Sequence, residues 1–144
     1  MIEQVGFEAI YPLWRNHLWP NRTSPIESHS AMLLYNTFDL KNFTYDADYF
    51  LYKVNGKTAG CNSGHMCCDG TYRSRGLFVF PEYRKQGIGT LLLLHTIDKA
   101  KTKQASIVWS YPRFESWSTY KSAGFKLVSD WTLGETGKNA FCTT

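Results

Sequence analysis

The spacing of hydrophobic residues predicts helices in the N-terminal third of the chain. Residues 5–7 predict a short first strand, and apolar positions between residues 9 and 19 recur at helical spacing until Pro20 ends the helix. A second helix is expected over residues 28–35, and residues 38–48 are expected to be irregular.

The pattern changes to that of paired strands at Tyr49. Residues 49–54 and 58–66 predict two strands, because the intervening Asn55-Gly56 is a strong signal for a two-residue hairpin. Residues 72–79 predict a third strand of the same meander.

Helices and short strands alternate in the last third of the chain. The expected elements are a helix, a strand, a second helix and two final strands, at residues 88–101, 105–109, 115–123, 125–128 and 140–142. Because a helix connects them, the strand at 105–109 is expected to run parallel to the strand that ends at Val79. The whole order predicts one α/β domain over residues 1–144 with a mixed sheet.

A basic, glycine-rich loop at residues 84–90 leads directly into the helix at 88–101. The unpaired N–H groups and positive dipole at such a helix start favour a phosphate or pyrophosphate. Gly87 and Gly89 allow the backbone to approach the anion closely. The loop lacks the Gly-Lys-Ser/Thr ending of the phosphate-binding loop in nucleoside triphosphatases. It also lacks the third glycine of the dinucleotide-binding motif G-x-G-x-x-G. It therefore predicts a phosphorylated cofactor of another kind.

Two segments carry a resemblance to a known family. Residues 84–89 resemble the acyl-coenzyme A pyrophosphate loop of the GCN5-related N-acetyltransferases (the GNAT superfamily), and residues 120–125, Tyr-Lys-Ser-Ala-Gly-Phe, resemble the family's later Y-x-x-x-G-F segment. The likeness extends from about Tyr49 to Phe125. Segments 62–66 and 109–113 also resemble small GNAT-like proteins encoded by marine phages.

The resemblance implies a fold, a cofactor and an activity. The implied fold is a mixed, mostly antiparallel sheet flanked by helices and splayed between two central parallel strands. The implied activity is direct transfer of an acetyl group from acetyl-coenzyme A to a primary amine of a small molecule or peptide. The residues that would hold the cofactor are Leu77, Phe78, Val79, Arg84, Lys85, Gln86, Gly87, Ile88, Gly89 and Thr90.

The resemblance also assigns two catalytic roles. The backbone N–H of Val79 would donate to the thioester carbonyl, in the manner of an oxyanion hole. Tyr120 stands at the position of the general acid that protonates the coenzyme A thiolate. The alternative for Tyr120 is a helix residue that only packs against the sheet.

The general base is not evident from the sequence. Many family members carry Glu or His where this chain has Arg73, and Arg75 follows on the same face of the strand. Arginine cannot act as a base at ordinary pH. Arg73 and Arg75 would instead bind an anionic substrate, such as an acidic amino acid or a phosphate-bearing amine, or form solvent-facing salt bridges. His65, Glu27 and Asp69 are candidate bases, although His65 also suits a structural role, and a water relay would need none of them.

The acceptor pocket in this family is built by the first two helices and the loop between them. Here that implies Trp14, His17, Trp19, Arg22 and Glu27. This part of the chain resembles the family least, so the acceptor itself is not identified.

Composition narrows the alternatives. A hydrophobic share of 43% and a charged share of 19% indicate a globular chain. The net charge of +4 suits an anionic cofactor as well as nucleic acid, and without a cluster of basic residues nucleic acid is not expected to be a partner. Two other functions remain open: a GNAT-fold enzyme that modifies a nucleobase or transfers another group, and a non-catalytic acyl-coenzyme A-binding module.

Location, metal binding and assembly are also predicted from composition. No apolar stretch approaches the roughly 20 residues of a membrane helix, and the N-terminus lacks a signal-like segment, so a cytoplasmic protein is expected, in the host cytoplasm if it is phage-encoded. The four cysteines include no C-x-x-C pair, so no metal site is expected. A homodimer interface is considered around Trp131 and Phe141.

Overall fold

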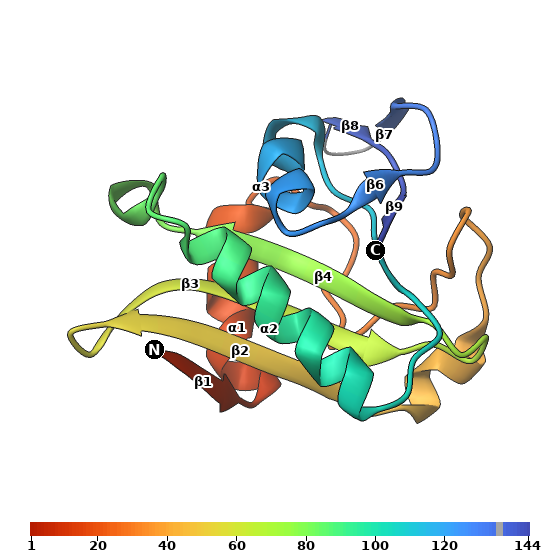
Figure 1. Ribbon diagram of the computed structural model, residues 1–144, viewed down its shortest axis with the longest axis horizontal. Coiled ribbons are helices and arrows are strands. Elements are labelled where there is room, and N and C mark those ends of the chain that lie inside the picture. Colours follow the sequence, from red (N-terminus) through yellow and green to blue (C-terminus); the bar gives the residue numbers. More distant parts are fainter. Residues whose placement is uncertain (135–136) are drawn as a thin grey trace.

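The structure of the chain is a computed structural model that describes residues 1–134 and 137–144 (Figure 1). Its elements are β1 (Ile2–Val5), α1 (Phe7–Leu13), β2 (Ala47–Val54), β3 (Lys57–Met66), β4 (Tyr72–Val79), α2 (Ile88–Thr102), β5 (Val108–Ser110), α3 (Trp117–Ser122), β6 (Lys126–Leu127), β7 (Thr132–Gly134), β8 (Gly137–Asn139) and β9 (Cys142–Thr143).

Seven strands form one mixed sheet in the order β1-β2-β3-β4-β5-β9-β6, and β7 and β8 pair separately. Neighbouring strands are antiparallel from β1 to β4 and again from β5 to β6, whereas β4 and β5 run parallel. The parallel pair follows from α2, which carries the chain from one end of β4 back to the start of β5. The predicted fold class is confirmed.

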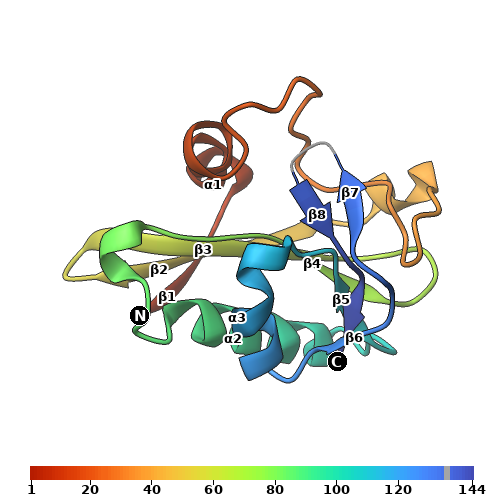
Figure 2. The same cartoon turned by 90° about the horizontal axis from the view of Figure 1, so that it is seen from above.

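Helices cover both faces of the sheet, with α1 on one face and α2 and α3 on the other (Figure 2). The strand β2 is buried on both sides because its residues alternate between these layers. Tyr49 and Leu51 belong to a buried cluster with Trp14, whereas Phe50 packs with Leu92 of α2. The apolar periodicity of the sequence therefore corresponds to two cores, one on each side of the sheet.

A β-bulge interrupts β4 at Gly76. Two steps along β3 are opposed by three steps along β4, so β4 carries one extra residue there. Gly76 has a φ of +81°, in the left-handed region that favours glycine. The indole Nε1 of Trp14 donates to the carbonyl oxygen of Gly76 at 2.9 Å, which ties the end of the α1 layer to the bulge.

The two parallel strands separate next to this bulge. Their pairing is confined to Tyr72 with Val108 and Arg73 with Trp109. One residue later, the hydroxyl of Ser110 donates to the carbonyl of Ser74 at 2.8 Å. A side-chain hydrogen bond thus takes the place of the backbone hydrogen bonds between the two strands at this point. From that point the remaining part of β4 has no strand neighbour on the β5 side among the described residues.

The predicted helix at residues 28–35 is wrong, since the structure has no helix there. Side chains from elsewhere bind the backbone groups that a helix would need. The amide of Asn42 donates to the carbonyls of Ser30 and Met32, and the Tyr49 hydroxyl donates to the carbonyl of Ser28. Asn42 is fully buried, so these tertiary bonds form in a dry environment and replace the local helix.

Other elements differ from expectation mainly at their ends. The first strand is β1 rather than residues 5–7, because Gly6 is already the N-cap residue of α1. The helix predicted over residues 9–19 continues from α1 into a π-helical turn at Trp14–Leu18. The pairing of β7 with β8 and a 3₁₀ turn at Leu40–Thr44 were not predicted. These two strands are three residues long and mostly exposed, so they lack an apolar pattern.

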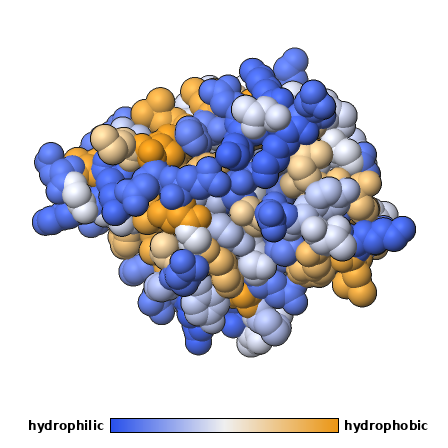
Figure 3. Space-filling model, turned by 90° about the horizontal axis from the view of Figure 1, so that it is seen from below, coloured by the Kyte–Doolittle hydropathy of each residue, from blue (hydrophilic) through white to orange (hydrophobic). Residues whose placement is uncertain are grey.

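The described residues were compared with the requirements of a membrane-crossing helix and of a metal site. None of the described helices has both the length and the apolar character that crossing a bilayer requires. On the face shown in Figure 3, hydrophobic residues form separate patches among polar ones. Within residues 1–134 and 137–144, no three His, Cys, Asp or Glu side chains gather in a group that could hold a metal ion. Phe141, considered above for an interface, is buried in a cluster with Trp109.

We expect Gly76→Ala to destabilise the protein by about 2–5 kcal/mol. An alanine would have to keep a left-handed backbone, and its Cβ would overlap the Trp14 ring. Gly56→Ala is the matched control, because Gly56 has a similar φ of +78° but a Cβ added there would meet no atom within 4 Å, and it should lose only about 1 kcal/mol. Chemical denaturation of both variants checks this, and equal losses would contradict the role of the Trp14 contact.

Candidate functional site

The first turn of α2 presents backbone N–H groups that no side chain caps. Gly87 is the N-cap residue, with a φ of +80°, and no side-chain hydrogen bond is made to this helix end. A Cβ at Gly87 would meet no atom within 4 Å, so the space in front of the loop is open. The orphan N–H groups and the helix dipole make this end a suitable site for an anion.

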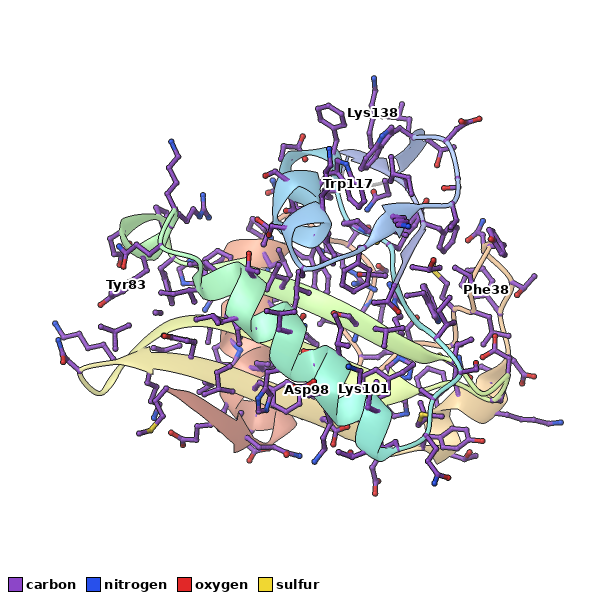
Figure 4. All side chains as sticks on the ribbon, viewed as in Figure 1. Phe38, Tyr83, Asp98, Lys101, Trp117 and Lys138 are labelled. Atoms are coloured by element: carbon purple, nitrogen blue, oxygen red, sulfur yellow. The ribbon has the colours of Figure 1, made fainter. Side chains whose placement is uncertain are left out.

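A cleft of about 700 Å³, here called the α2 cleft, opens in front of this helix end. Tyr83, which lies on the segment before α2 (Figure 4), is one of the residues that line it. Gln86 is the one predicted cofactor residue that does not line it, and its amide is directed to the carbonyl of Glu82 instead. The predicted residues that do line it are Leu77, Phe78, Val79, Arg84, Lys85, Gly87, Ile88, Gly89 and Thr90.

Val79 directs its backbone polar groups away from β3 and toward the gap that β5 leaves. Its neighbour Phe80 donates its N–H to the carbonyl of Ala59 on β3, and successive residues of a strand point these groups to opposite edges. The carbonyl of Val79 accepts from Nε of Arg84 at 2.8 Å on that far edge. The N–H of Val79 therefore faces the α2 cleft.

A second, smaller cavity of about 290 Å³ adjoins the α2 cleft. We call it the arginine cavity, because four of its lining residues are Arg22, Arg73, Arg75 and Arg113. The two spaces share four lining residues, Leu18, Leu77, Arg113 and Ser116. They therefore adjoin beside the β4 bulge, at Leu77.

Arg73 and Arg75 are buried, with 8% and 5% of their surfaces exposed. The reading of these residues as a solvent-facing salt-bridge pair is wrong, since neither takes part in an ion pair among the described residues. Burial lowers the pKa of Arg73 to about 10 and that of Arg75 to about 9, and the proximity of Arg73 contributes to the shift of Arg75. Both remain cationic at neutral pH.

Tyr120 lies on α3 with its side chain buried to 3% exposure and lines the arginine cavity. Its ring packs edge-on against Phe125, the last residue of the Y-x-x-x-G-F segment. Burial raises the pKa of Tyr120 to about 12, while a hydrogen bond with Ser110 acts in the opposite direction. The hydroxyl therefore stays protonated across the neutral range and can act as a donor.

The candidate bases do not line the arginine cavity. His65 is buried, with Nδ1 3.0 Å from the Met66 carbonyl and Nε2 accepting from the Ser30 N–H, and burial lowers its pKa to about 3. Asp69 binds the N–H and hydroxyl of Thr71 within its own turn. Glu27 is exposed, and only its backbone carbonyl approaches the site, by accepting from Arg75 at 2.8 Å. None of these three positions favours proton removal from a bound amine.

The residues predicted on the acceptor side lie at different places around the two spaces. Trp19 and Arg22 line the arginine cavity, whereas His17 lines the α2 cleft and stacks on Phe78. Trp14 does not line either space and instead supports the bulge.

Sequence reasoning missed Arg113 and Ser110. Arg113 lines both spaces and is held by a 3.0 Å hydrogen bond from Nη2 to the Leu18 carbonyl. Ser110 ends β5 at the point where the strands part. The sequence signal that could have found them is their position: Ser110 ends a strand that runs parallel to its neighbour, and Arg113 follows that end. Binding sites in α/β proteins commonly lie at the carboxyl ends of parallel strands.

The chain was compared with models of known protein families and with curated proteins. The model of the acetyltransferase (GNAT) family matches residues 11–125. No curated protein matches the sequence of this chain.

Several solved bacterial structures share this fold. Escherichia coli ElaA is 14% identical, with a TM-score of 0.73 over 99% of this chain and 97% of its own. The ribosomal-protein-alanine N-acetyltransferase of Brucella melitensis is 15% identical, with a TM-score of 0.69 over 100% and 98%. A Bacillus subtilis acetyltransferase solved in complex with CoA is 16% identical, with a TM-score of 0.57 over 72% and 77%. At these identities the likeness establishes the fold alone.

The buried His65 predicts a loss of stability in acid. Its pKa is lowered from 6.5 to about 3, so below pH 6.5 the unfolded chain binds a proton that the folded chain does not. The free energy of unfolding should then fall by up to about 1.4 kcal/mol per pH unit from this residue alone. Urea denaturation between pH 7 and 4 measures the slope. His65→Gln should make it shallower, and His95→Gln, at an exposed position on α2, should not; equal slopes in all three proteins would exclude this origin.

Proposed function

The chain belongs to the acetyltransferase (GNAT) family, and on that basis we propose that it transfers the acetyl group of acetyl-coenzyme A directly to a primary amine. The observation that carries the proposal is the meeting of two spaces beside the β4 bulge. One contains an uncapped helix start, and the other contains a buried, protonated tyrosine.

The α2 cleft would hold acetyl-coenzyme A. The first-turn N–H groups of α2 would bind its diphosphate, with Arg84 and Lys85 supplying positive charge at the rim. Gly87 supports this fit, because the open space in front of it would admit phosphate oxygens close to the backbone. The pantetheine arm would lie along Leu77–Val79, where β4 has no strand neighbour on the β5 side.

Two groups of the chain would act on the thioester of acetyl-coenzyme A, in which the carbonyl carbon of the acetyl group is bonded to sulfur. The Val79 N–H would donate to the carbonyl oxygen and stabilise the negative charge that develops there. A new carbon–nitrogen bond would form to the amine as the carbon–sulfur bond breaks. The Tyr120 hydroxyl would donate its proton, or a strong hydrogen bond, to the departing sulfur.

The amine would lose its proton to water rather than to a dedicated side chain. Among the described residues, the arginine cavity is lined by no carboxylate and no imidazole. The guanidinium groups would themselves lower the pKa of a bound ammonium group, because like charges disfavour its charged form. This electrostatic effect raises the fraction of neutral, nucleophilic amine at a given pH.

Gly87→Ala should weaken acetyl-coenzyme A binding by at least about tenfold, since its Cβ would enter the space in front of the helix start. Isothermal titration measures the dissociation constant. Gly56→Ala is the matched control, with the same left-handed backbone but a position on the β2–β3 hairpin, and it should bind normally. Wild-type affinity in Gly87→Ala would refute the assignment of the loop.

Tyr120→Phe should lower kcat by about a hundredfold and leave acetyl-coenzyme A binding unchanged, because only the proton donor is lost. Thiol release from acetyl-coenzyme A with an accepted amine measures kcat. Tyr11→Phe, on the exposed side of α1, is the control. Because the pKa of Tyr120 is raised to about 12, its ionisation should cause no fall in kcat below about pH 10.

An unchanged kcat in Tyr120→Phe would remove the general-acid role without affecting the cofactor assignment. Tight binding of acetyl-coenzyme A with no turnover on any amine would instead support a non-catalytic binding module.

A further inference from the structure

We infer that the acceptor amine carries a carboxylate or phosphate group, and that the arginine cavity binds this anionic group. The inference rests on the proposed function, because it names the class of amine that would enter the site. It is carried by the charge of the cavity: four arginines line it, and no aspartate or glutamate does so among the described residues.

The guanidinium group of Arg73 has unused hydrogen-bonding capacity. The residue is 8% exposed, and its Nε is buried without a hydrogen-bond partner. Its guanidinium carbon lies 5.0 Å from the centre of the Trp109 ring, which makes a cation–π contact with the guanidinium. This contact does not provide a hydrogen-bond acceptor for the N–H groups. A buried, charged donor without an acceptor is costly, and an anionic ligand in the cavity would satisfy it.

Arg75 is held in place with part of its donor set still available. Its guanidinium lies 4.9 Å from the Trp14 ring and 5.3 Å from the Trp19 ring, and Nη1 donates to the Glu27 carbonyl. Arg22 packs on the same Trp19 ring at 5.1 Å. Stacking on indole restrains a guanidinium plane while leaving N–H groups at its edge, which suits recognition of a carboxylate or phosphate.

The fold pairs its buried charge elsewhere. Asp48, which is 5% exposed, accepts from the ammonium of Lys103 and from the Tyr72 hydroxyl. The described ion pairs include none of the four arginines of the cavity. Among residues 1–134 and 137–144, the positive charge of the cavity is thus not balanced by an ion pair, which leaves it available to an anionic ligand.

The size of the cavity favours a compact acceptor. A volume of about 290 Å³ is at the lower end of the range for small-molecule pockets. An amine of amino-acid size, with its anionic group on Arg73 and Arg75 and its nitrogen toward the α2 cleft, would fill this space. The shared residues Leu77 and Arg113 mark where the nitrogen would meet the thioester.

The test compares matched amines in the thiol-release assay. Glutamate and glycine are set against glutaminamide and glycinamide, phosphoethanolamine against ethanolamine, and spermidine serves as the cationic amine. We expect kcat/KM for the anionic member of a pair to exceed its neutral counterpart by about tenfold to a hundredfold. The carboxylate and phosphate arms show which anion is preferred. Equal or better turnover of the neutral or cationic amines would overturn the inference.

Arg73→Gln and Arg75→Gln should remove this preference, mainly through a higher KM for the anionic amines. Arg15→Gln, at an exposed position in the π-helical turn, is the matched control and should retain it. Thermal unfolding without ligand provides a folding check. Arg73→Gln should unfold at the same or a higher temperature than the parent protein, because it removes a buried charge without an ionic partner. A preference that persists in both folded variants would refute the role of the cavity.

A binding measurement separates this inference from the proposed function. Titration of the protein with glutamate and with phosphoethanolamine, both with and without saturating CoA, should give binding that Arg73→Gln abolishes, whether or not turnover occurs. Binding of acetyl-coenzyme A without binding of either anionic amine would reject the inference and leave the proposed function intact. Anion binding lost in Arg73→Gln, in a protein that does not bind acetyl-coenzyme A, would support the cavity and reject the proposed function.

Discussion

The left-handed conformation of Gly76 is the constraint on which the site depends. It inserts one extra residue into β4 without breaking the pairing with β3. The Trp14 ring occupies the place that a Cβ would take and bonds the Gly76 carbonyl, so the bulge is held from the α1 side. On the other side β5 pairs with only the first part of β4. The gap between the parallel strands is therefore a consequence of packing between layers, and it is where the two spaces of the site meet.

The second organising feature is the burial of cationic side chains against tryptophan. Trp14 has a double role, because the same ring that supports the bulge also packs against Arg75. Indole rings offset part of the cost of removing a guanidinium from water, but they do not neutralise its charge. The site thus combines a rigid strand distortion with guanidinium charges that form no ion pair within the part of the chain that the structure describes. Buried charges of this kind lower the stability of the free protein. Binding sites commonly contain such unfavourable groups, because a ligand compensates for them.

Much of the fold could be predicted because its signals are local. The Asn55-Gly56 turn specifies the β2–β3 hairpin, with both residues at positive φ, and the glycine-rich loop specifies the start of α2. Segment 28–35 could not be predicted, because its backbone is bound by Asn42 and Tyr49, which are distant in sequence. His65 shows the same limit: its residue type suits a base, but its burial was not readable from neighbouring residues.

The sequence by itself determined the order of the central elements, the parallel arrangement of the strands joined by α2, and the loop that would face a phosphate. These depend on periodicity, turn residues and helix ends, which act over a few residues. Only the tertiary structure decided that Arg73 and Arg75 are buried in one cavity with Arg22 and Arg113, and that Tyr120 lines it. The physical reason is that burial and charge balance arise where distant segments meet. The alternating charges of Arg73 and Arg75 are typical of a solvent-facing strand, yet other segments of the fold bury them.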